Sequence, residues 1–118
     1  MKDVKKVLIV FLLLTAWNSA FGNDKTCLIE NIYFEARSQG QAGWLAVAQV
    51  TLNRVDDKRF PNTICEVVKQ GLTYASGDPI RNKCQFSWFC DGLSDKPRDE
   101  YNWNVCVTIA YIALSKRV

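Results

Sequence analysis

The sequence contains no histidine among its 118 residues. Serine–histidine and cysteine–histidine nucleophile pairs are therefore excluded, and so is any zinc site with imidazole ligands. The five cysteines never stand in a Cys-x-x-Cys pair, the spacing typical of thiolate metal sites. Repeats, low-complexity tracts and linkers are also absent, so a chain of this length has room for one domain. Zinc held by cysteines alone is the alternative, but we expect neither a bound metal ion nor a cofactor.

An uncharged, strongly apolar stretch near the N-terminus is too short to span a membrane. Residues 7–22 carry no charge, whereas a transmembrane helix needs about 20 apolar residues. Three lysines precede this stretch, and Ala20 and Gly22 end it in the small-x-small pattern of a cleavage site. We therefore expect residues 1–22 to be a secretory signal peptide that is removed on export. The protein would meet the membrane only through this signal.

The chain carries little net charge once this segment is removed. Cleavage takes away three of the 15 lysine and arginine residues and one of the 12 aspartate and glutamate residues, so the net charge falls from +3 to +1. A nucleic-acid-binding domain usually keeps a strong basic surplus in its folded part. We therefore expect no nucleic-acid partner, and we expect the mature protein in the periplasm, in the cell wall or outside the cell.

All five cysteines lie beyond the expected cleavage site. A small exported domain has a modest core, for which disulfides compensate, and an odd number leaves one cysteine unpaired or paired between chains. Alternating apolar positions over residues 84–90 predict a half-buried strand about 20 Å long, whose two terminal cysteines would be too far apart to bond. We expect that one disulfide joins Cys27 to Cys106, and Cys65 could pair with a cysteine of the strand.

Helical periodicity dominates the rest of the chain. Apolar residues recur every three to four positions in three segments, as amphipathic helices require. These segments are residues 26–37, 41–55 and 100–116. Thr63 and Glu66 match a capping box, which predicts a short helix ending at Gly71. With a loop or a turn over 72–83 before the strand, the pattern predicts an α-rich α+β domain.

Glu35 is the first candidate for chemistry, because it lies near the end of the first predicted helix beside Tyr33 and Phe34. Apolar neighbours disfavour the charged form of a carboxyl group and raise its pKa toward neutrality, as a general acid requires. Arg37 would oppose that shift if it reached the carboxylate. The alternative is a solvated glutamate on the polar face of the helix.

The segment Gln85-Phe86-Ser87-Trp88 is the second candidate. Sugar rings stack on aromatic side chains, while amide and hydroxyl groups hydrogen-bond to sugar hydroxyls, so these four residues could line a glycan groove. The alternative is that both rings face the core, as aromatic residues on a strand usually do. Three aspartates could supply a second carboxylate or could lie in surface turns, namely Asp78, Asp91 and Asp95.

Several short motifs follow one another in a fixed order over residues 27–92. They are Ile32-Tyr33-Phe34-Glu35-Ala36-Arg37, Gly43, Ala46-Val47-Ala48-Gln49-Val50, Leu52-Asn53-Arg54-Val55, Arg59-Phe60-Pro61-Asn62-Thr63, Cys65, Val67-Val68 and Gln85-Phe86-Ser87-Trp88. This order resembles the cell wall hydrolases related to the spore cortex-lytic enzymes. That family is found in bacteria and their phages.

The resemblance implies a lysozyme-like domain of the lytic-transglycosylase type over residues 23–118, acting on the glycan strands of peptidoglycan. It implies that Glu35, the glutamate of the family's Glu-Ala-Arg motif, is the catalytic acid. The bond cleaved would be the β-1,4 link from N-acetylmuramic acid to N-acetylglucosamine, with a 1,6-anhydro sugar as product. The residues expected to bind substrate are Tyr33, Arg37, Gln85, Phe86, Ser87 and Trp88.

The sequence departs from the family pattern in two places. Ser38-Gln39 follows the Glu-Ala-Arg motif, where the family usually has Gly-Glu. The family domain generally continues past its last helix, so with Val118 as the final residue we expect a domain that lacks its C-terminal part. One alternative function is a peptidoglycan-binding or inhibitory module without turnover. Another is a secreted structural protein with no glycan affinity, in which Phe86 and Trp88 would be wholly buried.

Overall fold

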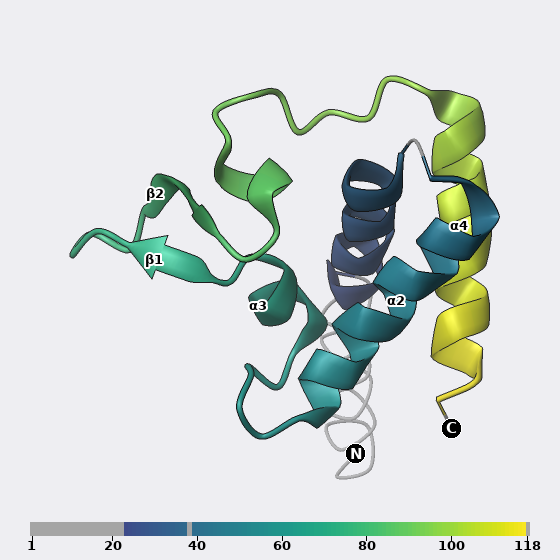
Figure 1. The fold of residues 1–118 in the computed structure, drawn as a ribbon, viewed down its shortest axis with the longest axis horizontal. Coiled ribbons are helices and arrows are strands. Elements are labelled where there is room, and N and C mark those ends of the chain that lie inside the picture. Colours follow the sequence, from purple (N-terminus) through teal and green to yellow (C-terminus); the bar gives the residue numbers. More distant parts are fainter. Residues whose placement is uncertain (1–22, 38, 118) are drawn as a thin grey trace, which may run out of the picture.

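The computed structural model describes residues 23–37 and 39–117, which form a helix-rich fold with one small sheet (Figure 1). In chain order the elements are an N-terminal helix (23–36), α2 (Gly40–Asp56), α3 (Ile64–Val68), β1 (Gly71–Thr73), β2 (Pro79–Cys84), the 3₁₀ turn η1 (Ser87–Cys90) and α4 (Glu100–Ser115). The expected signal peptide, residues 1–22, lies outside the described residues. Within those residues, no helix combines the length and the apolarity needed to cross a bilayer.

The three long helices confirm the predictions made from apolar periodicity, with ends that differ by at most a few residues. The predicted cap of α3 is also present, because the hydroxyl oxygen of Thr63 accepts a hydrogen bond of 3.2 Å from the backbone N–H of Glu66. This helix ends at Val68 rather than at Gly71. Local sequence signals therefore placed each helix correctly.

The helices share one apolar core. α2 contacts both α3 and α4, and Figure 1 shows it crossing in front of the N-terminal helix. The fully buried core side chains include Leu28 and Ile32 from the N-terminal helix, Val67 and Val68 from α3, and Cys106 from α4. The core thus joins elements from both ends of the described chain.

The sequence predicted a loop or a turn over residues 72–83 and missed its two strands, because most of this segment belongs to an antiparallel hairpin. β1 and β2 pair with Gly71 opposite Cys84, and a side chain at Gly71 would come within 2.7 Å of the Lys83 carbonyl oxygen. Asn82 has a φ of 64°, as a bulged strand allows. Since nearly every residue of the hairpin is exposed on both faces, it carries no apolar alternation from which strands could be predicted.

The predicted strand over residues 84–90 is also wrong beyond its first residue, and the disulfide prediction fails with it. The chain turns into η1, which brings the Cα atoms of Cys84 and Cys90 to 6.1 Å, and these two cysteines are bonded. A 3₁₀ turn rises about 2.0 Å per residue, far less than a strand, so the assumed separation does not apply. Phe86, Trp88 and Cys90 are nevertheless buried, as one face of the predicted strand would have been.

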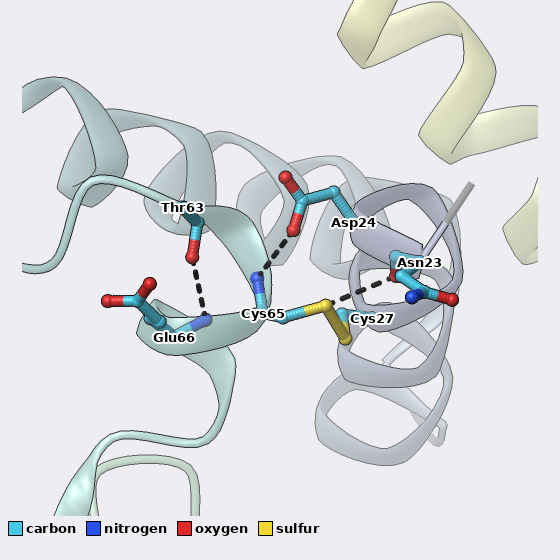
Figure 2. Close-up of a disulfide and its surroundings, with 6 residues drawn as sticks. All are labelled: Asn23, Asp24, Cys27, Thr63, Cys65 and Glu66. Carbon is cyan, nitrogen blue, oxygen red and sulfur yellow. Dashed lines mark hydrogen bonds between the residues drawn. A yellow bond between two sulfur atoms is a disulfide. The ribbon is translucent and has the colours of Figure 1, made fainter. Parts of the chain in front are cut away.

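The second disulfide joins Cys27 to Cys65 and thereby ties the N-terminal helix to α3 (Figure 2). Cys106, the partner expected for Cys27, is a free thiol in the core, where burial raises its pKa to about 11. Beside the disulfide, the carboxylate of Asp24 accepts a hydrogen bond of 3.1 Å from the backbone N–H of Cys65. Together with Thr63, Asp24 satisfies two of the N–H groups that a helix start leaves without a partner.

Candidate active site

Glu35 lies in the last turn of the N-terminal helix and is half-buried. Burial raises the pKa of its carboxyl group, and the positive charge of Arg54 from α2 opposes that rise. The expected opponent was Arg37, but its guanidinium lies 5.5 Å from the ring centre of Phe34 and 5.8 Å from that of Tyr33. A carboxyl group in such a setting keeps its proton to a higher pH than a solvated glutamate does, which suits proton donation.

A buried polar network lies one helical turn before Glu35. Asn31, four residues earlier and hence on the same helix face, donates a hydrogen bond of 2.9 Å to the hydroxyl of Thr51 in α2. Its side-chain oxygen accepts one of 2.9 Å from the indole N–H of Trp88 in η1. The Thr51 hydroxyl in turn donates to the carbonyl of Val47 at 2.8 Å. The network therefore holds the N-terminal helix, α2 and η1 together one helical turn before Glu35.

Asn31 was missed by the sequence analysis. It is a single polar residue within an apolar stripe, and nothing in the pattern names its partners, which stand 20 and 57 positions further along the chain. One usable signal was its spacing of four residues from Glu35. A second was the indole N–H of Trp88, which needs an acceptor when the ring is buried.

Aromatic rings surround the end of this helix. The ring of Phe34 stacks on that of Trp88 with 4.7 Å between centres and 21° between planes. The Arg54 guanidinium lies 5.0 Å from the ring centre of Phe86 and 5.2 Å from that of Phe60. These contacts hold the positive charge of Arg54 in a place from which it acts on Glu35.

The residues expected to bind substrate divide into two groups. Tyr33 is 2% exposed, and Phe86 and Trp88 are each 7% exposed, so all three rings belong to the core. The Tyr33 hydroxyl accepts hydrogen bonds from two backbone N–H groups of the segment before α4. The other three residues have exposed side chains, namely Arg37, Gln85 and Ser87. For all six, contact with a substrate stays a prediction.

The other carboxylates have surroundings of their own. Asp78 lies in the hairpin turn, where its carboxylate accepts a hydrogen bond of 3.1 Å from the Ser76 hydroxyl.

Burial raises the pKa of Asp95, and the charge of Asp91 adds to that rise. Burial likewise raises the pKa of Glu30, which Lys69 opposes and Asp95 reinforces. Glu30 and Glu35 are thus two half-buried acids on one helix.

Comparison with known proteins places the chain in a family. The family model described as Cell Wall Hydrolase matches residues 38–118. The chain therefore belongs to the cell wall hydrolase family. The matched region begins after Glu35 and includes α2, the hairpin, η1 and α4.

The spore cortex-lytic enzyme of Bacillus subtilis (strain 168) is a relative, with 35% identity over 54 residues. The similarity covers 46% of this chain and 18% of that enzyme, so the chain spans less than a fifth of its relative. None of the solved structures matches this chain.

Proposed function

We propose that this protein cleaves the glycan strands of peptidoglycan and that Glu35 is its catalytic acid. Membership of the cell wall hydrolase family supports this substrate, and so does the relative that is named for spore cortex lysis. The observation that carries the assignment of Glu35 is its half-buried position, where burial raises the pKa of its carboxyl group while leaving it in contact with solvent. A general acid needs both properties.

The proposal includes an exported, lysozyme-like domain. Disulfides persist in oxidising compartments outside the cytoplasm, so the bonds Cys27–Cys65 and Cys84–Cys90 support export. A helix-rich domain with one small hairpin is consistent with a lysozyme-like architecture. Residues 1–22 would then act as the export signal, and the mature protein would meet peptidoglycan in the periplasm or at the cell wall.

The proposed reaction is that of a lytic transglycosylase acting on the bond from C1 of N-acetylmuramic acid to O4 of N-acetylglucosamine. Glu35 donates its proton to the glycosidic oxygen as the C1–O4 bond breaks, and positive charge develops at C1. The C6 hydroxyl of the same muramoyl residue then bonds to C1 and returns its proton to the Glu35 carboxylate. The products are a free 4-hydroxyl and a 1,6-anhydro ring, and no water is consumed.

The surroundings of Glu35 suit both halves of this cycle. Burial favours the protonated acid before bond cleavage, while the charge of Arg54 favours the carboxylate that exists after it. The hydrogen bonds from Asn31 to Thr51 and from Trp88 to Asn31 keep the helix end in place against α2 and η1. A single acid of this kind is sufficient, because the internal hydroxyl replaces the second carboxylate of an ordinary glycosidase.

The test is mass spectrometry of the soluble products released from purified peptidoglycan by the wild-type protein and by Glu35→Gln. We expect anhydro-muropeptides from the wild type and a loss of about 1,000-fold in rate for Glu35→Gln, as removal of a general acid implies. Glu30→Gln is the matched control, since it neutralises the other half-buried acid of the same helix and should keep most of the activity.

Other products would change the proposal in defined ways. Muropeptides with reducing ends would replace the transglycosylase with a hydrolase and would require a water-activating carboxylate, for which Asp91 and Asp95 are the first to test. Equal losses in Glu30→Gln and Glu35→Gln would refute the specific role of Glu35. Wall binding by a folded wild type without any product would favour a binding module.

A further inference from the structure

A basic groove lies next to the aromatic end of the N-terminal helix. It is a cavity of about 280 Å³ lined by Phe34, Arg37, Leu93, Ser94, Lys96 and Arg98. Three of these six side chains are cationic, and none is acidic. We call this set of six residues the basic groove. It combines the helix that carries Glu35 with the segment that leads into α4.

The two walls of the basic groove are held together by a buried hydroxyl. Tyr33 sits in the core, and its hydroxyl oxygen accepts hydrogen bonds from the backbone N–H groups of Arg98 at 3.2 Å and of Asp99 at 3.1 Å. These contacts join positions that are 65 and 66 residues apart in the chain. The rings of Tyr33 and Phe34 in turn lie beneath the Arg37 guanidinium. Arg37 and Arg98 are thus placed on one cavity by fixed contacts.

The positive charges of the basic groove have no acidic partner within the described part of the chain. The ion pairs there are Arg59–Asp57 and Arg117–Asp56, neither of which involves a groove residue. Of the nearest carboxylates in sequence, Asp99 accepts two hydrogen bonds from Asn102 and caps α4. Among the residues that the structure describes, Asp95 forms no ion pair with a groove residue. Three clustered cations without acidic partners favour an anionic ligand.

We propose that the basic groove binds the carboxylates of the peptide stem carried by the muramoyl residue, which positions the glycan for cleavage at Glu35. This inference rests on the proposed function, because it assumes that peptidoglycan is the substrate. The stem is attached to the same sugar whose C1 reacts and carries free carboxylates, so a basic site on the helix that carries Glu35 suits this substrate. Phe34 and Arg37 flank Glu35 in sequence and line the groove. Charge-assisted contacts to carboxylates are the interactions that Lys and Arg form best.

The experiment measures binding of fluorescently labelled protein to peptidoglycan sacculi that have been freed of phosphate-containing wall polymers. The variant is Lys96→Gln combined with Arg98→Gln, whose side chains are exposed and whose backbone contacts are retained. The control is Lys58→Gln combined with Lys83→Gln, which removes the same charge from exposed positions outside the groove. Each protein is tested on native sacculi and on sacculi whose carboxylates have been converted to amides.

We expect the groove variant to bind native sacculi about tenfold more weakly than the wild type, as the loss of two exposed charge contacts implies. The wild type should bind amidated sacculi as weakly as the variant binds native ones, and amidation should not weaken the variant further. The control variant should keep the wild-type affinity for both substrates.

Three results would overturn the inference. In the first, the groove variant binds native sacculi as tightly as the wild type does. In the second, its affinity relative to the wild type falls by the same factor on amidated sacculi as on native ones. In the third, the control variant loses as much affinity for native sacculi as the groove variant does. Release of soluble products by the wild type is measured in parallel. Absence of those products would refute the proposed activity, whereas the binding pattern decides on the basic groove.

Discussion

The helices and the hairpin of β1 and β2 are stabilised in different ways. The helices share a core, and side-chain hydrogen bonds through Asn31 join the N-terminal helix to α2 and η1. The hairpin is almost entirely exposed, and it contacts η1 rather than the core of the helices. The disulfide Cys84–Cys90 links the end of β2 to η1, with a sequence separation of only 6. The helices therefore depend on long-range packing, and the hairpin depends on local backbone and covalent contacts.

The two disulfides express the same contrast. Cys27–Cys65 closes a segment with a sequence separation of 38, whereas Cys84–Cys90 closes one of 6. In the chain-entropy account a crosslink stabilises the fold by restricting the unfolded chain, and longer loops are restricted more. Removing each bond separately therefore measures how much each region contributes to global stability.

The largest expected effect is that of removing Cys27–Cys65 by the double substitution Cys27→Ala and Cys65→Ala. The free energy of unfolding should fall by about 4 kcal/mol, because a long loop is released in the unfolded state. Urea unfolding followed by circular dichroism measures the change. If the free energy of unfolding falls no more than it does on removal of the short disulfide, Cys27–Cys65 does not contribute more to global stability.

Breaking the buried network should have the next largest effect. Asn31→Ala leaves the Trp88 indole N–H without an acceptor and deprives the Thr51 hydroxyl of its donor, so the free energy of unfolding should fall by about 3 kcal/mol. Asn53→Ala is the control, since Asn53 accepts an exposed hydrogen bond from Gln49, and it should change stability by less than about 0.5 kcal/mol. Similar losses in both variants would show that the network adds nothing beyond a surface contact.

Removal of the short disulfide should be milder and more local. Cys84→Ala with Cys90→Ala should lower the free energy of unfolding by about 2 kcal/mol, as a short loop implies. Hydrogen exchange followed by mass spectrometry should show faster exchange in the hairpin and η1, with little change in α2 and α4. Uniform acceleration along the chain would mean that the two regions unfold as one unit.

The smallest expected effect is the pH dependence that Glu35 adds to stability. Because its pKa is raised in the folded state, the unfolded chain ionises first, so stability falls as the pH rises from the unfolded-state pKa to the folded-state pKa. Glu35→Gln should therefore match the wild type in acid and become the more stable protein at neutral pH. Urea midpoints across this range measure the difference. A constant gap between the two proteins at every pH would exclude a raised pKa for Glu35.

Much of the helical part was predictable because its signals are local. The capping box of Thr63 and the apolar stripe of α4 each depend on residues within a few turns of one helix. The apolar surroundings of Glu35 also follow from its neighbours, and the direction of its pKa shift is as expected. The hairpin was not predicted because exposed strands show no alternation of apolar and polar residues. The strand predicted around Trp88 was wrong because a pattern of buried residues alone does not distinguish a strand from a 3₁₀ turn.

The sequence by itself determined where the helices form, that one of the five cysteines has no partner within the chain, and that Glu35 has rings beside it. Only the tertiary structure decided that Arg54 rather than Arg37 opposes the pKa shift of Glu35, and that Cys27 bonds to Cys65. It also decided that Lys96 and Arg98 meet Arg37 in one groove. The physical reason is that periodicity specifies which face of an element is buried, whereas partners far apart in the chain are specified only when the elements pack.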